Sequence, residues 1–263
     1  MGRVITIANQ KGGVGKTTTA INLGASLAIA ERRTLVIDCD PQGNATSGFG
    51  IRKDARDLSV YDCLVDGHAL EEAVRAEVHF PFLSVIPASR DLAGAELELI
   101  DRPSRERVLR QRLHDLRDRY EYILIDSPPS LGLLTLNALV AADTVLIPIQ
   151  CEFYALEGLS QLLNTVRLVQ RKINEDLEIE GVLLTMYDSR LNLSKQVVAE
   201  AREYFGGKVF ETMIPRNIRL AEAPSFGKPI ALYDVLSTGA RGYLSLAREL
   251  IERDEGGRSG GQK

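Results

Sequence analysis

Residues 10–23 read QKGGVGKTTTAINL, a glycine-rich turn that passes directly into a helical pattern. The apolar run VITIA at residues 4–8 leads into this turn, so the stretch has the form strand, loop, helix. A loop in that position, with Gly-Lys-Thr at its end, is typical of phosphate binding. The usual pattern GxxxxGK[ST] begins with a glycine where this chain has Gln10, and an additional lysine, Lys11, follows directly.

The chemistry expected of the loop follows from its residue types. Glycines let the backbone turn tightly and aim N–H groups at phosphate oxygens, and the helix that begins near Lys16 adds the positive end of its dipole. Lys16 is expected to contact the β and γ phosphates, Thr17 to bind Mg²⁺ and Thr18 to bond the α phosphate. The sequence therefore predicts a site for ATP and Mg²⁺. The nucleotide-binding loop comprises Lys11, Gly12, Gly13, Val14, Gly15, Lys16, Thr17 and Thr18.

Outward from the loop, short β-branched runs alternate with segments of helical period, which predicts an α/β fold with crossover helices. Strands are expected at residues 4–8, 34–38, 82–87, 122–126, 144–149, 180–186 and 209–214. Helices are expected at residues 16–30, 60–65, 104–119, 133–141, 156–173, 194–205 and 239–253. Several strands are apolar throughout, so we expect a mostly parallel twisted sheet of about seven or eight strands, covered by helices on both faces.

Length and composition indicate the domain organisation and limit the possible partners. The chain has 263 residues, and 44% of them are hydrophobic. We expect one ATPase domain over residues 1–253 with a disordered, glycine-rich tail at 254–263. The formal net charge of −4 provides no overall attraction to nucleic acid or anionic lipid, so such binding would need a local basic patch. Three widely spaced cysteines predict buried thiols in the cytoplasm, and no run approaches the ~20 apolar residues of a membrane-spanning helix.

Four blocks together resemble the ParA/Soj family of chromosome and plasmid partitioning ATPases. They are KGGVGKTTTAINL at 11–23, VIDCDPQGNAT at 36–46, YILIDSPPSLG at 122–132 and IPRNIRLAEAPSFGKPI at 214–230. The resemblance covers residues 3–250 and implies a P-loop ATPase of the deviant Walker A type, in which a second lysine characterises the loop. It implies that two ATP-bound subunits face each other, and that Lys11 of each reaches the partner's nucleotide.

The resemblance also implies roles for three carboxylates at predicted strand ends, where open α/β sheets place their ligands. Asp126 looks like the Walker B aspartate that holds Mg²⁺ through a water, and Asp38 would help to organise the metal shell. Asp40 matches the position that orients the attacking water. The catalytic residues would then be Lys11, Lys16 and Asp40, with slow hydrolysis because a carboxylate is a weak base.

Two further groups of residues match the family. The IPRN block resembles the adenine-binding loop, so Pro215, Arg216 and Asn217 are expected to contact the base. Arg190 and Arg219 match DNA-contacting arginines, and Lys195, Lys208 and Arg241 are possible additions to them. Since one or two phosphate contacts give little affinity, DNA binding would require the dimer.

The implied partners are a second copy of the chain, non-specific double-stranded DNA and a ParB/Spo0J-type centromere-binding protein that stimulates hydrolysis. The implied location is the cytoplasm, at the nucleoid. A MinD-like membrane ATPase is the main alternative, but EGGRSGGQK at 255–263 has no apolar residue to bury in lipid.

The sequence argues against one further kind of relative, and another remains as an alternative. An iron–sulfur relative would need cysteines after Asp126, where residues 127–144 have none. An ATP-using small-molecule enzyme of the dethiobiotin synthetase type belongs to a different functional class and would show turnover that depends on a small substrate rather than on DNA.

Overall fold

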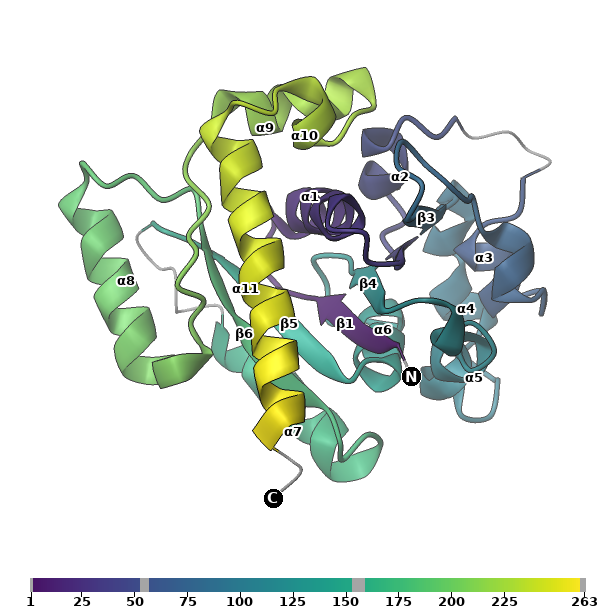
Figure 1. Ribbon diagram of the computed structural model, residues 1–263. Helices are drawn as coiled ribbons and strands as arrows, with labels where there is room; N and C mark the ends of the chain where they lie inside the picture. Colours follow the sequence, from purple (N-terminus) through teal and green to yellow (C-terminus); the bar gives the residue numbers. More distant parts are fainter. Residues whose placement is uncertain (1, 53–56, 153–158, 261–263) are drawn as a thin grey trace.

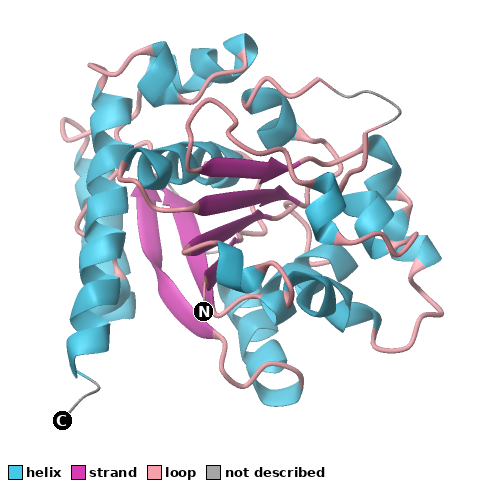
Figure 2. Ribbon diagram, turned by 45° about the vertical axis from the view of Figure 1, so that its right-hand side comes forward, coloured by secondary structure: helices cyan, strands magenta, loops and turns pink. Residues whose placement is uncertain are grey.

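The structure is a computed structural model that describes residues 2–52, 57–152 and 159–260. Its centre is one sheet of six parallel strands in the order β3-β2-β4-β1-β5-β6 (Figure 2). The strands are β1 (Arg3–Ile7), β2 (Thr34–Asp38), β3 (Leu83–Ile86), β4 (Tyr122–Asp126), β5 (Thr144–Gln150) and β6 (Glu178–Thr185).

Helices lie on both faces of this sheet (Figure 1). The α-helices are α1 (Lys16–Ile29), α2 (Asn44–Gly48), α3 (Val60–Leu64), α4 (Ala95–Glu98), α5 (Val108–Leu113), α6 (Leu133–Ala141), α7 (Leu159–Lys172), α8 (Asn192–Phe205), α9 (Ile218–Glu222), α10 (Ile230–Tyr233) and α11 (Thr238–Gly260). The short 3₁₀ helices are η1 (Leu70–Ala73), η2 (Arg90–Ala93), η3 (Arg105–Arg107), η4 (Arg117–Arg119), η5 (Gly206–Lys208) and η6 (Ala223–Phe226).

Successive side chains of the inner strands enter two separate cores. On β4, Ile123 and Ile125 pack into the core beneath α3, α5, α6 and α7, whereas Leu124 packs beneath α1 and α11. Continuous apolar strands are needed because both faces of the sheet are covered. The predicted parallel sheet with helices on both faces is therefore confirmed, and the three cysteines are buried and free, as predicted.

The strand count is a correction to the prediction of seven or eight. The expected strand at residues 209–214 makes only isolated bridges, Val182 with Val209 and Tyr187 with Pro215, in the described part of the chain. Two of its apolar side chains, Phe210 and Ile214, are still buried in the core beneath α11. A short segment of this kind packs on the edge of the sheet without forming a ladder, which sequence periodicity does not distinguish from a strand.

The helix expected at residues 104–119 is also broken in the structure. It consists of η3, α5 and η4, because the Asn137 side chain of α6 bonds to its backbone: the amide nitrogen donates to Arg105 O and the amide oxygen accepts from Leu109 N. Its arginines also form ion pairs with distant segments, Arg117 with Asp143 at 2.5 Å and Arg119 with Glu71. These arginines therefore hold the segment to other parts of the fold.

One predicted helix end differs from the structure, and another lies outside the described residues. Helix α11 continues to Gly260, so residues 254–260 are helical where a disordered tail was expected, and residues 261–263 lie outside the described residues. The first turn of the helix expected at 156–173 also lies outside them, and α7 is described from Leu159. On α7, the apolar side chains of Leu159, Val166 and Val169 are buried. The predicted domain extent of 1–253 stays a prediction.

Candidate active site

The glycine-rich loop leaves the carboxyl end of β1 and enters α1 at the centre of the sheet. Gly15 precedes the helix with φ +93°, a left-handed conformation that favours glycine, and no side chain caps the helix. The free N–H groups of its first turn therefore point out of the helix end as donors for an anion. Thr185 of β6 fixes the loop to the sheet, because its hydroxyl donates to Val14 O at 2.8 Å.

The two lysines of the loop occupy different places. The Lys16 side chain folds back over the loop, where its Nζ donates to Lys11 O at 3.0 Å, and the residue is only 6% exposed. Burial lowers the pKa of Lys16, and the charges of Asp126 and Asp40 partly oppose this. The Lys11 side chain is 39% exposed and its Nζ lies 2.5 Å from Glu152 Oε1. The two ammonium groups therefore have different partners, Lys16 in the loop itself and Lys11 at Glu152.

Asp126 is a buried carboxylate of the site whose oxygens lack hydrogen-bond partners in the described chain. It lies at the end of β4, where it is fully buried. Burial raises the pKa of Asp126 well above its usual range, and the charge of Asp38 adds to the rise. Thr17 lies near enough to favour the charged form, although the two groups are not aligned for a hydrogen bond.

Asp38 lies beside Asp126, because the two residues are register partners on β2 and β4. Its carboxylate accepts from Thr46 N at 2.7 Å, from the Thr46 hydroxyl at 2.6 Å and from Asp40 N at 3.2 Å. Burial raises the pKa of Asp38 to about 6, and the bonds from Thr46 oppose the rise. The bonds of Asp38 thus go to the segment that carries Asp40, and its role in the metal shell stays a prediction.

Asp40 lies in the turn after β2, where Gln42 N donates to its Oδ1 at 2.9 Å. It is only 6% exposed, and its charge partly opposes the burial that lowers the pKa of Lys16. Asp40 is therefore held close to the phosphate loop by its own turn and by Asp38.

The residues present fit a magnesium ion. In the described chain no group of three or more His, Cys, Asp or Glu side chains could hold a metal. Mg²⁺ does not require such a cage, since in nucleotide sites it binds one or two carboxylates, phosphates and several waters. A buried carboxylate without a partner is costly, and Asp126 beside the Thr17 hydroxyl would lose this cost on binding a cation.

A cavity of about 300 Å³ adjoins the phosphate loop and extends to the IPRN block. The residues that line it include Gly15, Thr18, Pro215, Arg216 and Asn217. Tyr243 of α11 also lines it, and its hydroxyl lies 3.1 Å from that of Thr19. The structure thus brings the predicted base-binding residues next to the predicted phosphate-binding residues. A mostly apolar pocket beside an anion site suits a purine base.

The Asn217 amide also has structural partners, which the sequence did not predict. Its oxygen caps α9 by accepting from Arg219 N at 2.8 Å, and its nitrogen donates to the Thr238 hydroxyl at 2.7 Å. Each amide atom can still make one more bond, so base contact by Asn217 stays a prediction.

Arg190 and Arg219 lie on the surface, each next to a carboxylate. Arg190 forms a bidentate pair with Asp188, with bonds of 2.9 and 2.7 Å, and this holds the pKa of Asp188 at about 2. Arg219 lies 2.9 Å from Glu222. These short-range acidic partners could have been found from the sequence spacing, and they mean that a phosphate would have to compete with them. Contact of either arginine with DNA stays a prediction.

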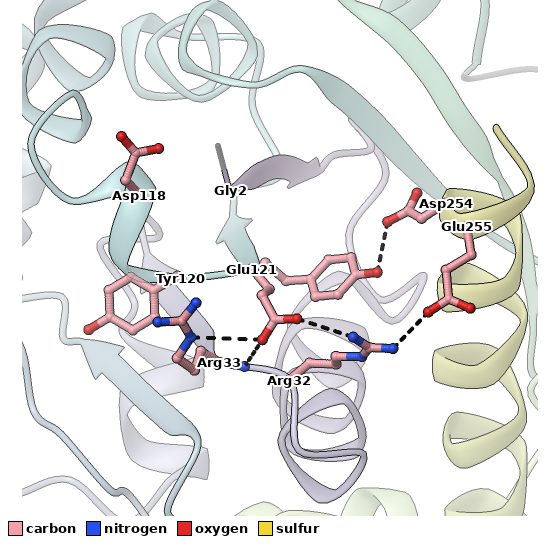
Figure 3. Close-up of a pocket in the computed structure, with 9 residues that line it drawn as sticks. Gly2, Arg32, Arg33, Asp118, Tyr120, Glu121, Asp254 and Glu255 are labelled. Atoms are coloured by element: carbon pink, nitrogen blue, oxygen red, sulfur yellow. Dashed lines mark hydrogen bonds and ion pairs between the residues drawn. The ribbon is translucent and has the colours of Figure 1, made fainter. Parts of the chain in front are cut away.

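A second cavity, of about 250 Å³, lies at the opposite edge of the sheet, around Gly2 and the start of β4 (Figure 3). Arg32 there lies between Glu121 at 3.2 Å and Glu255 at 2.8 Å. Asp254 pairs with Arg3 and accepts from the Tyr122 hydroxyl at 2.7 Å. These charges are paired within the protein.

A parallel sheet with this loop, a buried lysine and a strand-end aspartate defines a P-loop nucleotide-binding protein. Residues 2–179 match the family model described as AAA domain. The chain is 59% identical over 254 residues to chromosome partitioning protein ParA of Myxococcus xanthus, covering 97% of this chain and 89% of the relative. It is 60% identical over 250 residues to sporulation initiation inhibitor protein Soj of Bacillus subtilis, covering 95% and 98%.

Among solved structures, one described as cobyrinic acid a,c-diamide synthase from Mycobacterium smegmatis, with bound ADP and magnesium, superposes with a TM-score of 0.85 at 37% identity. The match covers 98% of this chain and 97% of that one. The chain belongs to the ParA/Soj family of chromosome-partitioning ATPases, and the predicted resemblance is confirmed. Within the described residues, no helix is long and apolar enough to cross a membrane.

Proposed function

We propose that this chain is an ATP-dependent switch that dimerises around its nucleotides, binds double-stranded DNA without sequence preference in that state, and releases it after hydrolysis. The observation that carries the proposal is the position of Lys11. A phosphate site already supplied with a buried lysine has a second lysine beside it, whose side chain is 39% exposed and pairs with Glu152. Such a cation is available to a second subunit.

ATP and Mg²⁺ are the cofactors, and this prediction is confirmed by the nucleotide- and magnesium-bound structures of the M. smegmatis relative. In the proposed reaction Lys16 binds the β and γ phosphates, and Thr17 and Asp126 hold the metal. The metal, when bound, neutralises charge on the phosphate oxygens. Asp40 accepts a hydrogen bond from the attacking water and aligns it.

Lys11 would act in the partner's site. To do so its Nζ must exchange Glu152 for the phosphates of the other subunit, where a cation stabilises charge that develops during phosphoryl transfer. The Lys11–Glu152 pair is half-exposed, and pairs of this kind are worth roughly 0.2–1 kcal/mol. A triphosphate therefore competes with it easily, and dimerisation depends on the γ phosphate.

The dimer would bring two copies of Arg190 and Arg219 to the same DNA duplex. Binding to backbone phosphates carries no sequence information, which matches a role at the nucleoid. A ParB/Spo0J-type protein at a centromere site would stimulate the slow hydrolysis, so that the cytoplasmic protein cycles on and off DNA during chromosome or plasmid segregation.

The testing experiment measures binding to a random-sequence duplex with ATP, with ADP and without nucleotide, using Asp40→Ala to hold the ATP state. We expect binding with ATP only, lost as salt rises because it depends on phosphate contacts. Equal binding in the three states, or none, would contradict the proposal.

A second experiment tests Lys11 directly. Lys11→Ala should abolish ATP-dependent dimerisation, measured by light scattering, while the monomer still binds nucleotide. The matched control is Lys172→Ala, which removes an exposed lysine at the end of α7. Normal dimerisation of Lys11→Ala with ATP would show that Lys11 does not act across the dimer.

A further inference from the structure

The motif APSFGKP at residues 223–229 is left without a role by the proposed function. In the structure its Gly227 packs directly against Gly50, just after α2, although the two residues are far apart in the chain. Both have positive φ, +63° for Gly227 and +71° for Gly50. Figure 1 shows the segment between α9 and α10 next to α2, above α1.

The contact leaves no room for a side chain. A Cβ on Gly227 would lie 2.5 Å from Gly50 Cα, and a Cβ on Gly50 would lie 2.8 Å from Gly227 O. Backbone meets backbone here, so neither side can give way by changing a rotamer. Displacing one of the two segments must therefore displace the other.

A histidine from a third segment forms hydrogen bonds to both sides of this contact. His79 Nε2 lies 2.9 Å from Phe49 O and 2.9 Å from Gly227 O. Since both partners are carbonyl oxygens, the nitrogen carries a proton and donates to the two together. His79 itself has φ +66°, a conformation uncommon for a residue with a side chain. We call Phe49, Gly50, His79 and Gly227 the α2–η6 joint.

The joint is tied on one side to the catalytic loop. Helix α2 begins four residues after Asp40, and Thr46 within it makes both side-chain and backbone bonds to Asp38. Gly43 N also donates to Asp40 O at 2.8 Å. A shift of the Asp40 turn is thereby passed to Gly50.

On its other side the joint is tied to the surface that carries Arg219. Helix η6 continues directly from α9, and Gly227 N donates to Pro224 O at 3.0 Å. Asn217 caps α9 by bonding Arg219 N at 2.8 Å, so α9 and the base-binding loop move together.

We propose that the α2–η6 joint couples the Asp40 loop to helix α9, so that the Arg219 surface responds to the γ phosphate, with His79 and Gly227 as positioning residues. The biological meaning of this coupling rests on the proposed function. The coupling between the two segments is a property of the chain alone and is tested without DNA. Neither His79 nor Gly227 lines the nucleotide cavity, so both act through other residues.

The test is hydrogen–deuterium exchange of the full chain with Mg²⁺ and either ADP or a non-hydrolysable ATP analogue. In the parent, segments 44–50 and 217–227 should both change protection between the two nucleotides. In Gly227→Ala, segment 44–50 should keep its response, and that of segment 217–227 should fall at least about fivefold, the low end of measured couplings between sites. A response of segment 217–227 unchanged by the substitution, or absent in the parent, would overturn the proposal.

Two further variants separate coupling from stability. Gly206→Ala imposes a backbone cost at least as large as that at Gly227, since Gly206 has φ +55° and ψ −132°. Its Cβ would meet nothing within 4 Å, so the response of segment 217–227 should persist. His79→Asn keeps a residue that tolerates positive φ but shortens the side chain so that it loses the two carbonyls. It should reduce the response as Gly227→Ala does, and full retention would overturn the proposal even if Gly227→Ala fails to fold.

DNA binding gives the second readout. The ratio of DNA affinities with ATP analogue and with ADP should fall at least about fivefold in His79→Asn, while nucleotide affinity stays within about twofold. An unchanged ratio contradicts the coupling. If the parent binds no DNA in either state, the proposed function fails alone, and the exchange measurement still decides the joint.

Discussion

The amino ends and the carboxyl ends of the parallel strands form two edges of the sheet, which we call the amino edge and the carboxyl edge, and the two edges treat charge in opposite ways. At the amino edge, Arg32 lies between Glu121 and Glu255, and Asp254 is bound by Arg3 and Tyr122 (Figure 3). At the carboxyl edge, both oxygens of Asp126 are buried without a hydrogen-bond partner in the described chain.

This difference separates structural charge from functional charge. Buried polar groups are normally paired, and an unpaired one needs an explanation. The pairs at the amino edge join the start of β4 to the end of α11, so they hold the fold. The unpaired carboxylate at the carboxyl edge lies near a buried lysine. We expect a bound metal ion to be the partner that this carboxylate lacks.

The largest effect is expected from Lys16→Ala at the carboxyl edge. Bonds from a cation to phosphate are worth about 1.5–3 kcal/mol, so nucleotide affinity should fall on the order of 100-fold. Calorimetry with ADP and with an ATP analogue measures this, and a circular dichroism spectrum controls for folding. Affinity within threefold of the parent would show that Lys16 does not bind the phosphates.

Asp126→Asn should have two opposite effects. Replacing the unpartnered carboxylate by a neutral amide should raise the stability of the nucleotide-free protein by roughly 1–3 kcal/mol, measured by urea unfolding. The same change should abolish the Mg²⁺ dependence of nucleotide binding. A nucleotide-free variant less stable than the parent would mean that Asp126 has a structural partner.

Arg219→Ala should leave nucleotide binding unchanged and weaken DNA binding. Losing one phosphate contact from each subunit should reduce the slope of log affinity against log salt by about 2 per dimer. Arg202→Ala, on α8 and paired with Glu211, is the matched surface control and should leave the slope as it is. An identical slope for both variants would remove Arg219 from the DNA surface.

The smallest effect is expected at the amino edge. Arg32→Ala breaks a partly exposed pair network and should cost about 0.5–1 kcal/mol of unfolding free energy, without changing ATP turnover. Thermal unfolding and a steady-state ATPase assay measure the two quantities. A loss of turnover comparable to that of Lys16→Ala would remove the distinction between the edges.

Prediction from the sequence succeeded where one short stretch sets its own geometry. The phosphate loop, the strand ending in Asp126 and the apolar helix α6 lie within the predicted ranges, because turns, apolar strands and helical stripes depend on neighbouring residues. It failed for residues 104–119 and 209–214, where Asn137 and the sheet edge decide the outcome from a distance.

The sequence by itself determined the class of protein, since the phosphate loop and the four blocks each lie in a continuous stretch. Only the tertiary structure decided which residues meet across long stretches of the chain. Lys11 meets Glu152 across 141 residues and His79 meets Gly227 across 148. The physical reason is that such contacts depend on which strands lie side by side and how closely their loops pack, and no local pattern records either.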